Sequence, residues 1–224
     1  MKVVIRLGGS VIGSPPNPKL IQKYTEIIQN LKAQGHEMVV IVGGGSHARE
    51  FIQLAKNLGL NEREQDEVAI SVSRLFAQLL SMKLGGLDWK TTPMALEEVA
   101  QVLHERGVAV MGGLRPGMTT DAVAALVASE IDARLIVKAT DQDGIYTKDP
   151  RRYPEAEKLD ELSWDDLGRL FGEAKHKAGI HQIIDPEAIR VLREKHIETI
   201  VVNGFKPENI TAAIRGEKIG TKIH

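Results

Sequence analysis

The chain contains no cysteine among its 224 residues. This absence excludes disulfide bonds, thiolate metal sites and thiol nucleophiles. It fits a protein of a reducing compartment, because disulfides persist in oxidising ones. We therefore expect a cytoplasmic location.

An excess of charge of one sign is also missing. Lysine and arginine number 29 against 30 aspartates and glutamates, for a net charge of -1. A balanced chain gives no electrostatic reason to expect nucleic acid or an anionic membrane as a partner. Any site for an anion must be local.

Long hydrophobic runs are absent from the N-terminus. The first residues, MKVVIRLGGSV, hold a short apolar run that ends in glycines. Such a run is too brief for a signal peptide or a membrane span. We expect a soluble protein without a membrane partner.

Four familiar motifs are missing from the sequence. It has no G-x-x-x-x-G-K-[ST] loop, no G-x-G-x-x-G after its first strand and no G-x-S-x-G elbow. Its histidines show no H-x-x-x-H spacing, so zinc catalysis has little support and we expect no protein metal site. If the chain binds phosphates, it holds them by another arrangement.

Short apolar segments alternate along the chain with segments of helical periodicity. Strands are expected at 3–7, 37–42, 108–111, 134–140 and 198–202, and helices at 19–33, 45–58, 62–84, 92–107, 121–131 and 185–196. Near-continuous apolar strands separated by helices predict a mainly parallel open sheet covered on both faces, an α/β three-layer αβα sandwich. No stretch has the composition of a domain linker.

Several helix starts carry capping signals. Asn17 with Pro18, and Asp185 with Pro186, have the spacing of a cap followed by proline at the first helical position. The segment 92–107, which starts Thr-Pro, repeats this pattern. Asn61 and Glu64 are spaced as a capping box.

Four predicted strands end in turns rich in glycine, hydroxyl groups or acids. These turns are RLGGSV (6–11), VGGGSHAR (42–49), MGGLRPGMTTD (111–121) and KATDQDGIYTKDP (138–150). The carboxyl ends of parallel strands share one edge, where open α/β sheets bind ligands. Free amides at helix starts, aided by the helix dipole, suit phosphate groups. The convergence predicts a phosphate-ligand site.

At these motifs a resemblance becomes specific. The chain resembles the uridylate (UMP) kinases of the amino acid kinase family, above all their short archaeal form. The segments that carry this resemblance are IRLGGSV, VGGGSHAREF, GGLRPGMTTDAVAALVA, KATDQDGIYTKDPR and GEKIGTKI. The resemblance covers nearly the whole chain. It implies a single domain, 1–224, with an acceptor-binding N-terminal half and an ATP-binding C-terminal half. It also implies transfer of the ATP γ-phosphoryl group to UMP, with Mg²⁺ as cofactor, in a hexamer.

The resemblance assigns one group of residues to ATP. These are Gly9, Ser10, Gly45, Arg49, Thr140, Tyr146 and Asp149. Glycines let phosphate approach the backbone, since no Cβ stands in the way. Structural alternatives stay open: a solvated helix arginine for Arg49, a packed aromatic for Tyr146, and a turn former for Asp149 before Pro150.

A second group is assigned to UMP. These are Gly44, Asp66, Leu114, Arg115, Pro116, Gly117, Met118, Thr119 and Thr120. Gly44 would face the acceptor and Gly45 the donor, so that a side chain at position 44 would block the acceptor without unfolding the protein. Asp66 could accept from ribose hydroxyls or be one of several surface acids. Thr119 or Thr120 could bind the α-phosphate or serve only as an N-cap.

Arg6 and Asp143 are the expected catalytic residues. Bacterial relatives have lysine at the position of Arg6, and arginine differs from lysine in geometry and hydration. Arg6 could supply charge to the transferred phosphoryl group or pair with an acid at a strand edge. Asp143 could organise metal and cations or shape a turn, and Lys138 could reach a phosphate or offset Asp143.

Three functions are compatible with these residues. The first is a UMP kinase, which needs no strong base because its acceptor is already anionic. The second is a related kinase acting on another small phosphate or carboxylate. The third is a non-catalytic nucleotide-binding protein of the same fold, favoured by the loss of the first-strand lysine.

Overall fold

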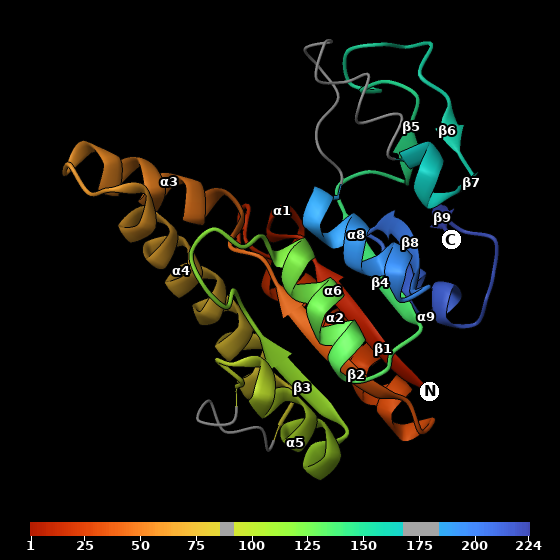
Figure 1. Ribbon diagram of the computed structural model, residues 1–224. Coiled ribbons are helices and arrows are strands. Elements are labelled where there is room, and N and C mark those ends of the chain that lie inside the picture. The colour runs from red at the N-terminus through yellow and green to blue at the C-terminus, as the bar shows by residue number, and fades with distance from the viewer. Residues whose placement is uncertain (86–91, 168–183) are drawn as a thin grey trace.

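The computed structural model describes residues 1–85, 92–167 and 184–224. Within these ranges, no helix is long and apolar enough to cross a membrane. Figure 1 shows the arrangement of the elements.

The centre of the molecule is a seven-stranded sheet with the order β3-β2-β1-β4-β8-β9-β7. Its strands are β1 (Lys2–Leu7), β2 (Glu37–Val42), β3 (Val108–Met111), β4 (Leu135–Thr140), β7 (Glu161–Leu162), β8 (Glu198–Asn203) and β9 (Thr221–Ile223). Strands β3, β2, β1, β4 and β8 are mutually parallel, whereas β9 runs antiparallel to β8. The expected mainly parallel α/β sheet is confirmed.

Helices cover both faces of this sheet. The described helices are α1 (Gly9–Ile12), α2 (Pro18–Ala33), α3 (Gly45–Asn57), α4 (Glu62–Lys83), α5 (Leu96–Arg106), α6 (Thr120–Glu130), α8 (Pro186–Glu194) and α9 (Glu208–Ile214). One buried cluster joins the sheet to α5, α6 and α8, and the other joins it to α2, α4 and α9. In Figure 1, α6 lies over the front of the sheet and α2 behind it, while α3 and the start of α4 project beyond the sheet.

Side-chain alternation along the parallel strands divides the two faces. Val3 and Ile5 of β1 face the α2 side, and Val4 faces the α6 side. Arg6 follows in the same alternation and so lies on the α6 face. Since β1 pairs in register with β4, Arg6 stands directly beside Lys138 on that face.

Most of the expected elements agree with the structure to within one residue or two. Asn17 accepts from the backbone of Leu20 at the start of α2, and Asp185 accepts from Glu187 at the start of α8, each with proline at the first turn. The capping box of Asn61 and Glu64 is present.

The predicted start of the helix at 92–107 is wrong. Helix α5 begins at Leu96, with Ala95 as its N-cap residue. The Glu98 carboxylate accepts from the backbone nitrogens of Met94 (2.8 Å) and Ala95 (3.4 Å). This side chain satisfies amides at a start three residues later than the Thr-Pro signal predicts.

Six short elements of the described ranges have no counterpart in the sequence prediction: α1, β5 (Ile145–Tyr146), β6 (Lys158–Leu159), β7, α9 and β9. The strands β5 and β6 form a separate antiparallel pair. Helix α9 and strand β9 complete the C-terminal part of the large sheet. In Figure 1, β5 and β6 lie beyond the sheet, on the side away from α3 and α4.

Candidate functional site

Three of the predicted turns meet at the carboxyl edge of the sheet. Gly8 N donates to Ala139 O of β4 at 2.8 Å, and Gly43 N donates to Leu7 O of β1 at 3.0 Å. These bonds extend the strand ladder past the ends of the strands. The turns after β1 and β2 are therefore fixed relative to one another, as their positions in a parallel sheet predicted.

Gly9 and Gly45 lie in direct backbone contact. A Cβ on Gly9 would overlap the backbone nitrogen of Gly45, and a Cβ on Gly45 would overlap the carbonyl oxygen of Gly9. Gly45 also has φ +64, a conformation that glycine adopts readily. These two predicted ATP residues are thus brought together, and their contact by itself requires glycine.

Gly44 packs closely against Ala48 of α3 and near Ala69 of α4. Its φ of -83 is accessible to any residue, but a Cβ there would lie 2.5 Å from Ala48 Cβ and 3.5 Å from Ala69 O. A larger side chain would press on α3 and α4 before it reached a ligand. The expectation of an undisturbed fold therefore meets a steric obstacle at Ala48.

Five predicted acceptor residues surround one hollow. It has a volume of about 130 Å³ and is lined by Gly44, Asp66, Arg115, Met118 and Thr120, together with Ala48, Ala69, Ile70, Ser73 and Gly113. The hollow lies between the N-terminus of α3, the first half of α4 and the loop that precedes α6. Residues separated by 76 positions in the sequence thus meet around it.

Helix α4 holds the loop that precedes α6. Asp66 Oδ2 accepts from Gly117 N at 2.7 Å, and Ser73 Oγ accepts from Gly113 N at 2.8 Å. Thr119 is the N-cap of α6, since its hydroxyl accepts from Ala122 N at 3.1 Å. The capping role left open for Thr119 is therefore present, and one oxygen of Asp66 supports the loop.

The remaining residues of the acceptor loop differ in their exposure to solvent. Leu114 and Pro116 are half-buried, whereas Arg115 and Gly117 are exposed. Gly117 adopts φ +77, and a Cβ at this position would have no other atom within 4 Å. The turn at Pro116 and Gly117 is open to solvent beside the hollow.

A buried charged cluster lies on the α6 face beside the hollow. Asp121, in the first turn of α6, places Oδ1 2.9 Å from Arg6 Nε and Oδ2 2.6 Å from Lys138 Nζ. Arg6 Nη2 also donates to Thr120 Oγ1 at 2.9 Å. The side chains are 17%, 7% and 13% exposed for Arg6, Lys138 and Asp121.

Burial and charge act in opposite directions on this cluster. Burial favours the neutral carboxyl of Asp121, but Arg6 and Lys138 outweigh it and hold its pKa below the usual range. Burial, and then the Arg6 cation, lower the pKa of Lys138 to about 8, although Asp121 favours the charged form. With all three groups ionised, the cluster keeps one excess positive charge.

Lys138 does not offset Asp143, contrary to one of the two roles predicted for it. It forms its ion pair with Asp121. Asp143 instead accepts from Asn203 Nδ2 at 3.0 Å and lies 3.6 Å from Lys206 Nζ, with its side chain 55% exposed. Arg6 likewise pairs with a helix acid, and the predicted strand-edge acid is wrong.

The other predicted ATP residues lie on several elements, from α1 and α3 to the end of β4 and the segment around β5. Ser10 is half-buried in α1, and Arg49 is exposed on α3. Thr140 ends β4 and donates to Asp141 Oδ1 at 3.2 Å, while Tyr146 is half-buried in β5. Asp149 Oδ1 accepts from Arg151 N at 3.0 Å, so the turn-forming alternative for Asp149 is present.

Asp121 is a site residue that the sequence patterns did not single out. A usable signal was present, because Arg6 and Lys138 interrupt apolar strands and a buried cation needs an anionic partner. Asp121 is the acid in the first turn of a helix whose residues 122–128 are all apolar, which makes it the natural candidate. The crossing of α6 over β1 and β4 brings the three groups together.

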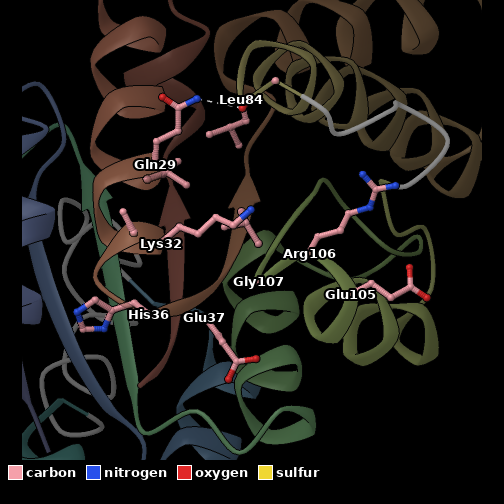
Figure 2. Close-up of a pocket in the computed structure, with 13 residues that line it drawn as sticks. Gln29, Lys32, His36, Glu37, Leu84, Glu105, Arg106 and Gly107 are labelled. Atoms are coloured by element: carbon pink, nitrogen blue, oxygen red, sulfur yellow. Dashed lines mark hydrogen bonds between the residues drawn. The ribbon is translucent and has the colours of Figure 1, made fainter.

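A larger cavity lies at the opposite edge of the sheet, between the ends of α2, α4 and α5. It measures about 920 Å³ and is shown in Figure 2. Its wall carries the cations Lys32 and Arg106 and the acids Glu37 and Glu105. Mixed charge does not favour a polyanion, and the cavity lies away from the glycine turns. We therefore assign the candidate site to the carboxyl edge.

The glycine turns, the loop before α6 and the open parallel sheet define a class of protein. The chain belongs to the amino acid kinase family, whose model matches residues 1–203. It is 38% identical over 225 residues to a uridylate kinase of Methanocaldococcus jannaschii, covering 100% of this chain and 99% of that protein. It is 35% identical over 223 residues to a uridylate kinase of Methanobrevibacter smithii, with the same coverage.

Solved structures agree with this family. The crystal structure of uridylate kinase from Archaeoglobus fulgidus superposes with a TM-score of 0.90 at 38% identity and 100% coverage of both chains. A UMP kinase structure from Bacillus anthracis superposes with a TM-score of 0.80 at 22% identity, over 100% of this chain and 95% of that one. This second likeness concerns the fold alone.

Proposed function

We propose that this protein transfers the γ-phosphoryl group of ATP to UMP, giving ADP and UDP in pyrimidine nucleotide biosynthesis. The observation that carries the proposal is the hollow lined by Gly44, Asp66, Arg115, Met118 and Thr120. Residues assigned to the acceptor by resemblance alone surround one space beside the glycine turns. Relatives named uridylate kinase match the chain from end to end.

In the proposed mechanism, UMP lies against the loop before α6 and ATP lies across the glycine contact. The UMP phosphate attacks the γ-phosphorus in line, and the protein contributes position and positive charge. The excess charge of the cluster of Arg6, Asp121 and Lys138, together with the N-termini of α3 and α6, lies on this edge. Arg49 adds an exposed cation to the donor side.

We propose that Mg²⁺ binds together with ATP. Within the described ranges, no group of three or more acids and histidines could hold a metal ion. Mg²⁺ commonly binds through substrate phosphates with one or two carboxylates, which fits such a chain. Asp143 is the carboxylate that we propose would hold the ion, and the ion would neutralise phosphate charge when bound.

We propose one domain, with the acceptor bound by the N-terminal half and ATP by the C-terminal half. We further propose a cytoplasmic homo-oligomer, a hexamer by family resemblance. Support for association comes from large apolar side chains that are exposed along α4, on α3 and at the C-cap of α3. They are Phe51, Leu54, Leu58, Leu75, Leu79 and Met82.

A coupled assay for ADP tests the function. UMP, CMP, dUMP and isopentenyl phosphate are offered in turn with MgATP, and UMP is expected to give the highest kcat/KM. Turnover that is independent of UMP would contradict the proposal. Preference for another acceptor would favour a related kinase. ATP binding without turnover would favour the non-catalytic alternative.

A further inference from the structure

Helix α4 contacts the acceptor loop through one more side chain, Arg74. Its Nε donates to Gly113 O at 3.0 Å and its Nη2 donates to Leu114 O at 2.9 Å. Nη2 also lies 3.5 Å from Met94 O, in the segment before α5. One half-buried guanidinium thus binds two consecutive carbonyl groups of the loop.

These two bonds fix the direction of two amides. In a trans peptide the C=O and the following N–H point in opposite directions. With the carbonyls of Gly113 and Leu114 turned toward Arg74, the N–H groups of Leu114 and Arg115 point away from it. Both belong to the loop assigned to UMP, and Arg115 lines the hollow.

Adjacent contacts hold this part of the loop against α4. Gly113 N donates to Ser73 Oγ, and Ser73 Oγ donates in turn to Ile70 O at 2.7 Å. Gly112 packs so closely on α4 that a Cβ would lie 2.6 Å from Arg74 N. Arg74 therefore continues a support that begins with backbone packing and reaches Leu114.

We propose that Arg74 is a positioning residue of the acceptor site, which aims the amides of Leu114 and Arg115 at a phosphorylated acceptor. The proposal rests on the proposed function and deepens it. Arg74 acts through the loop and also adds a positive charge behind it, so its loss affects the acceptor more than ATP. Charged hydrogen bonds of this kind are among the stronger ones in proteins.

The test compares Arg74→Met, Arg74→Lys and the control Arg63→Met, which removes an exposed arginine from the same helix. We expect Arg74→Met to raise KM for UMP about tenfold to a hundredfold, from the usual strength of charged hydrogen bonds. KM for ATP should stay within about twofold, on the same reasoning. Arg74→Lys should give a KM for UMP between those of the wild type and Arg74→Met, because lysine keeps the charge but lacks the planar guanidinium with its several N–H donors.

A merely structural role would change kcat and both KM values together, or lower the thermal midpoint alone, and either result overturns the proposal. If Arg74→Met does not fold, the Arg74→Lys variant is read by the same criterion. Amide hydrogen exchange over residues 110–120 gives a readout that needs no activity. Faster exchange in Arg74→Met than in Arg63→Met supports the positioning role, and equal exchange overturns it. If the wild-type protein is inactive with UMP, this result contradicts the proposed function and not the role of Arg74 in the loop.

Discussion

Single residues at the site carry two kinds of constraint, steric and electrostatic. Gly9 and Gly45 need to be glycine because their backbones touch. Asp121 needs to be an anion because it lies between Arg6 and Lys138 in a nearly dry environment. In both cases the reason lies in a contact between segments that are distant in the sequence.

The carboxylate of Asp121 offers the first prediction. Asp121→Asn removes the carboxylate that pairs with both Arg6 and Lys138, and breaking a buried ion pair in this way costs about 3–5 kcal/mol of unfolding free energy. Urea denaturation measures the loss. The control is Asp165→Asn, which removes the partner of Arg193 in a pair whose side chains are 62% and 59% exposed. That change should cost less than about 1 kcal/mol, and equal costs for the two variants would contradict the account.

Lys138 gives a prediction about pH. Its folded pKa of about 8 lies below the unfolded value of 10.5, so the unfolded chain binds more protons between these pH values. Stability contributed by this group is present above pH 10.5 and lost as pH falls through 8. The unfolding free energy of the wild type, minus that of Lys138→Met, should rise by up to about 3 kcal/mol over this window. A difference in unfolding free energy that does not change with pH would contradict the lowered pKa of Lys138.

At the scale of elements, the close approach of α1 to α3 is the contact that shapes the donor side. Gly9→Ala would force the two turns apart, and overpacking of this kind costs about 1–3 kcal/mol. KM for ATP should rise as well. The control is Gly59→Ala, where φ is +79 and no atom lies within 4 Å, so only backbone strain is added. Normal ATP kinetics in Gly9→Ala would contradict the donor placement.

Elements with local signals could be predicted from the sequence. Helices α2 and α8 begin where a cap and a proline stand together, and β1 to β4 follow their apolar runs. Helix α5 was misplaced because a Thr-Pro pair gives the same local signal, whereas Glu98 caps a later start. Strand β9 was missed because its three residues depend on pairing with the distant β8.

Some features of the candidate site could likewise be predicted from the sequence, and others could not. The position of the glycine turns at one edge follows from parallel pairing alone. The ligand assignments came from family resemblance. The supports of the loop, Ser73 and Arg74, could not be predicted, because helical periodicity does not say which loop a helix face will meet.

At the scale of the whole molecule, the projecting pair of helices suggests association. Leu54 on α3 is 52% exposed, and Leu58, the C-cap residue of that helix, is 71% exposed; exposed apolar patches mark interaction sites. Leu54→Glu with Leu58→Glu should shift the protein to smaller species in size-exclusion chromatography with light scattering. Phe205→Glu, at a residue 51% exposed near α9, is the matched control. An unchanged mass in the double variant would remove this surface from the proposed oligomer.

The central claim is that backbone amides at the carboxyl edge of the sheet hold two nucleotides. A crystal structure with UMP and a non-hydrolysable ATP analogue tests it most directly. We expect the UMP phosphate against residues 114–120 and the ATP phosphates across Gly9 and Gly45. Nucleotides bound instead in the cavity beside Lys32 and Arg106, with the glycine edge empty, would contradict the account.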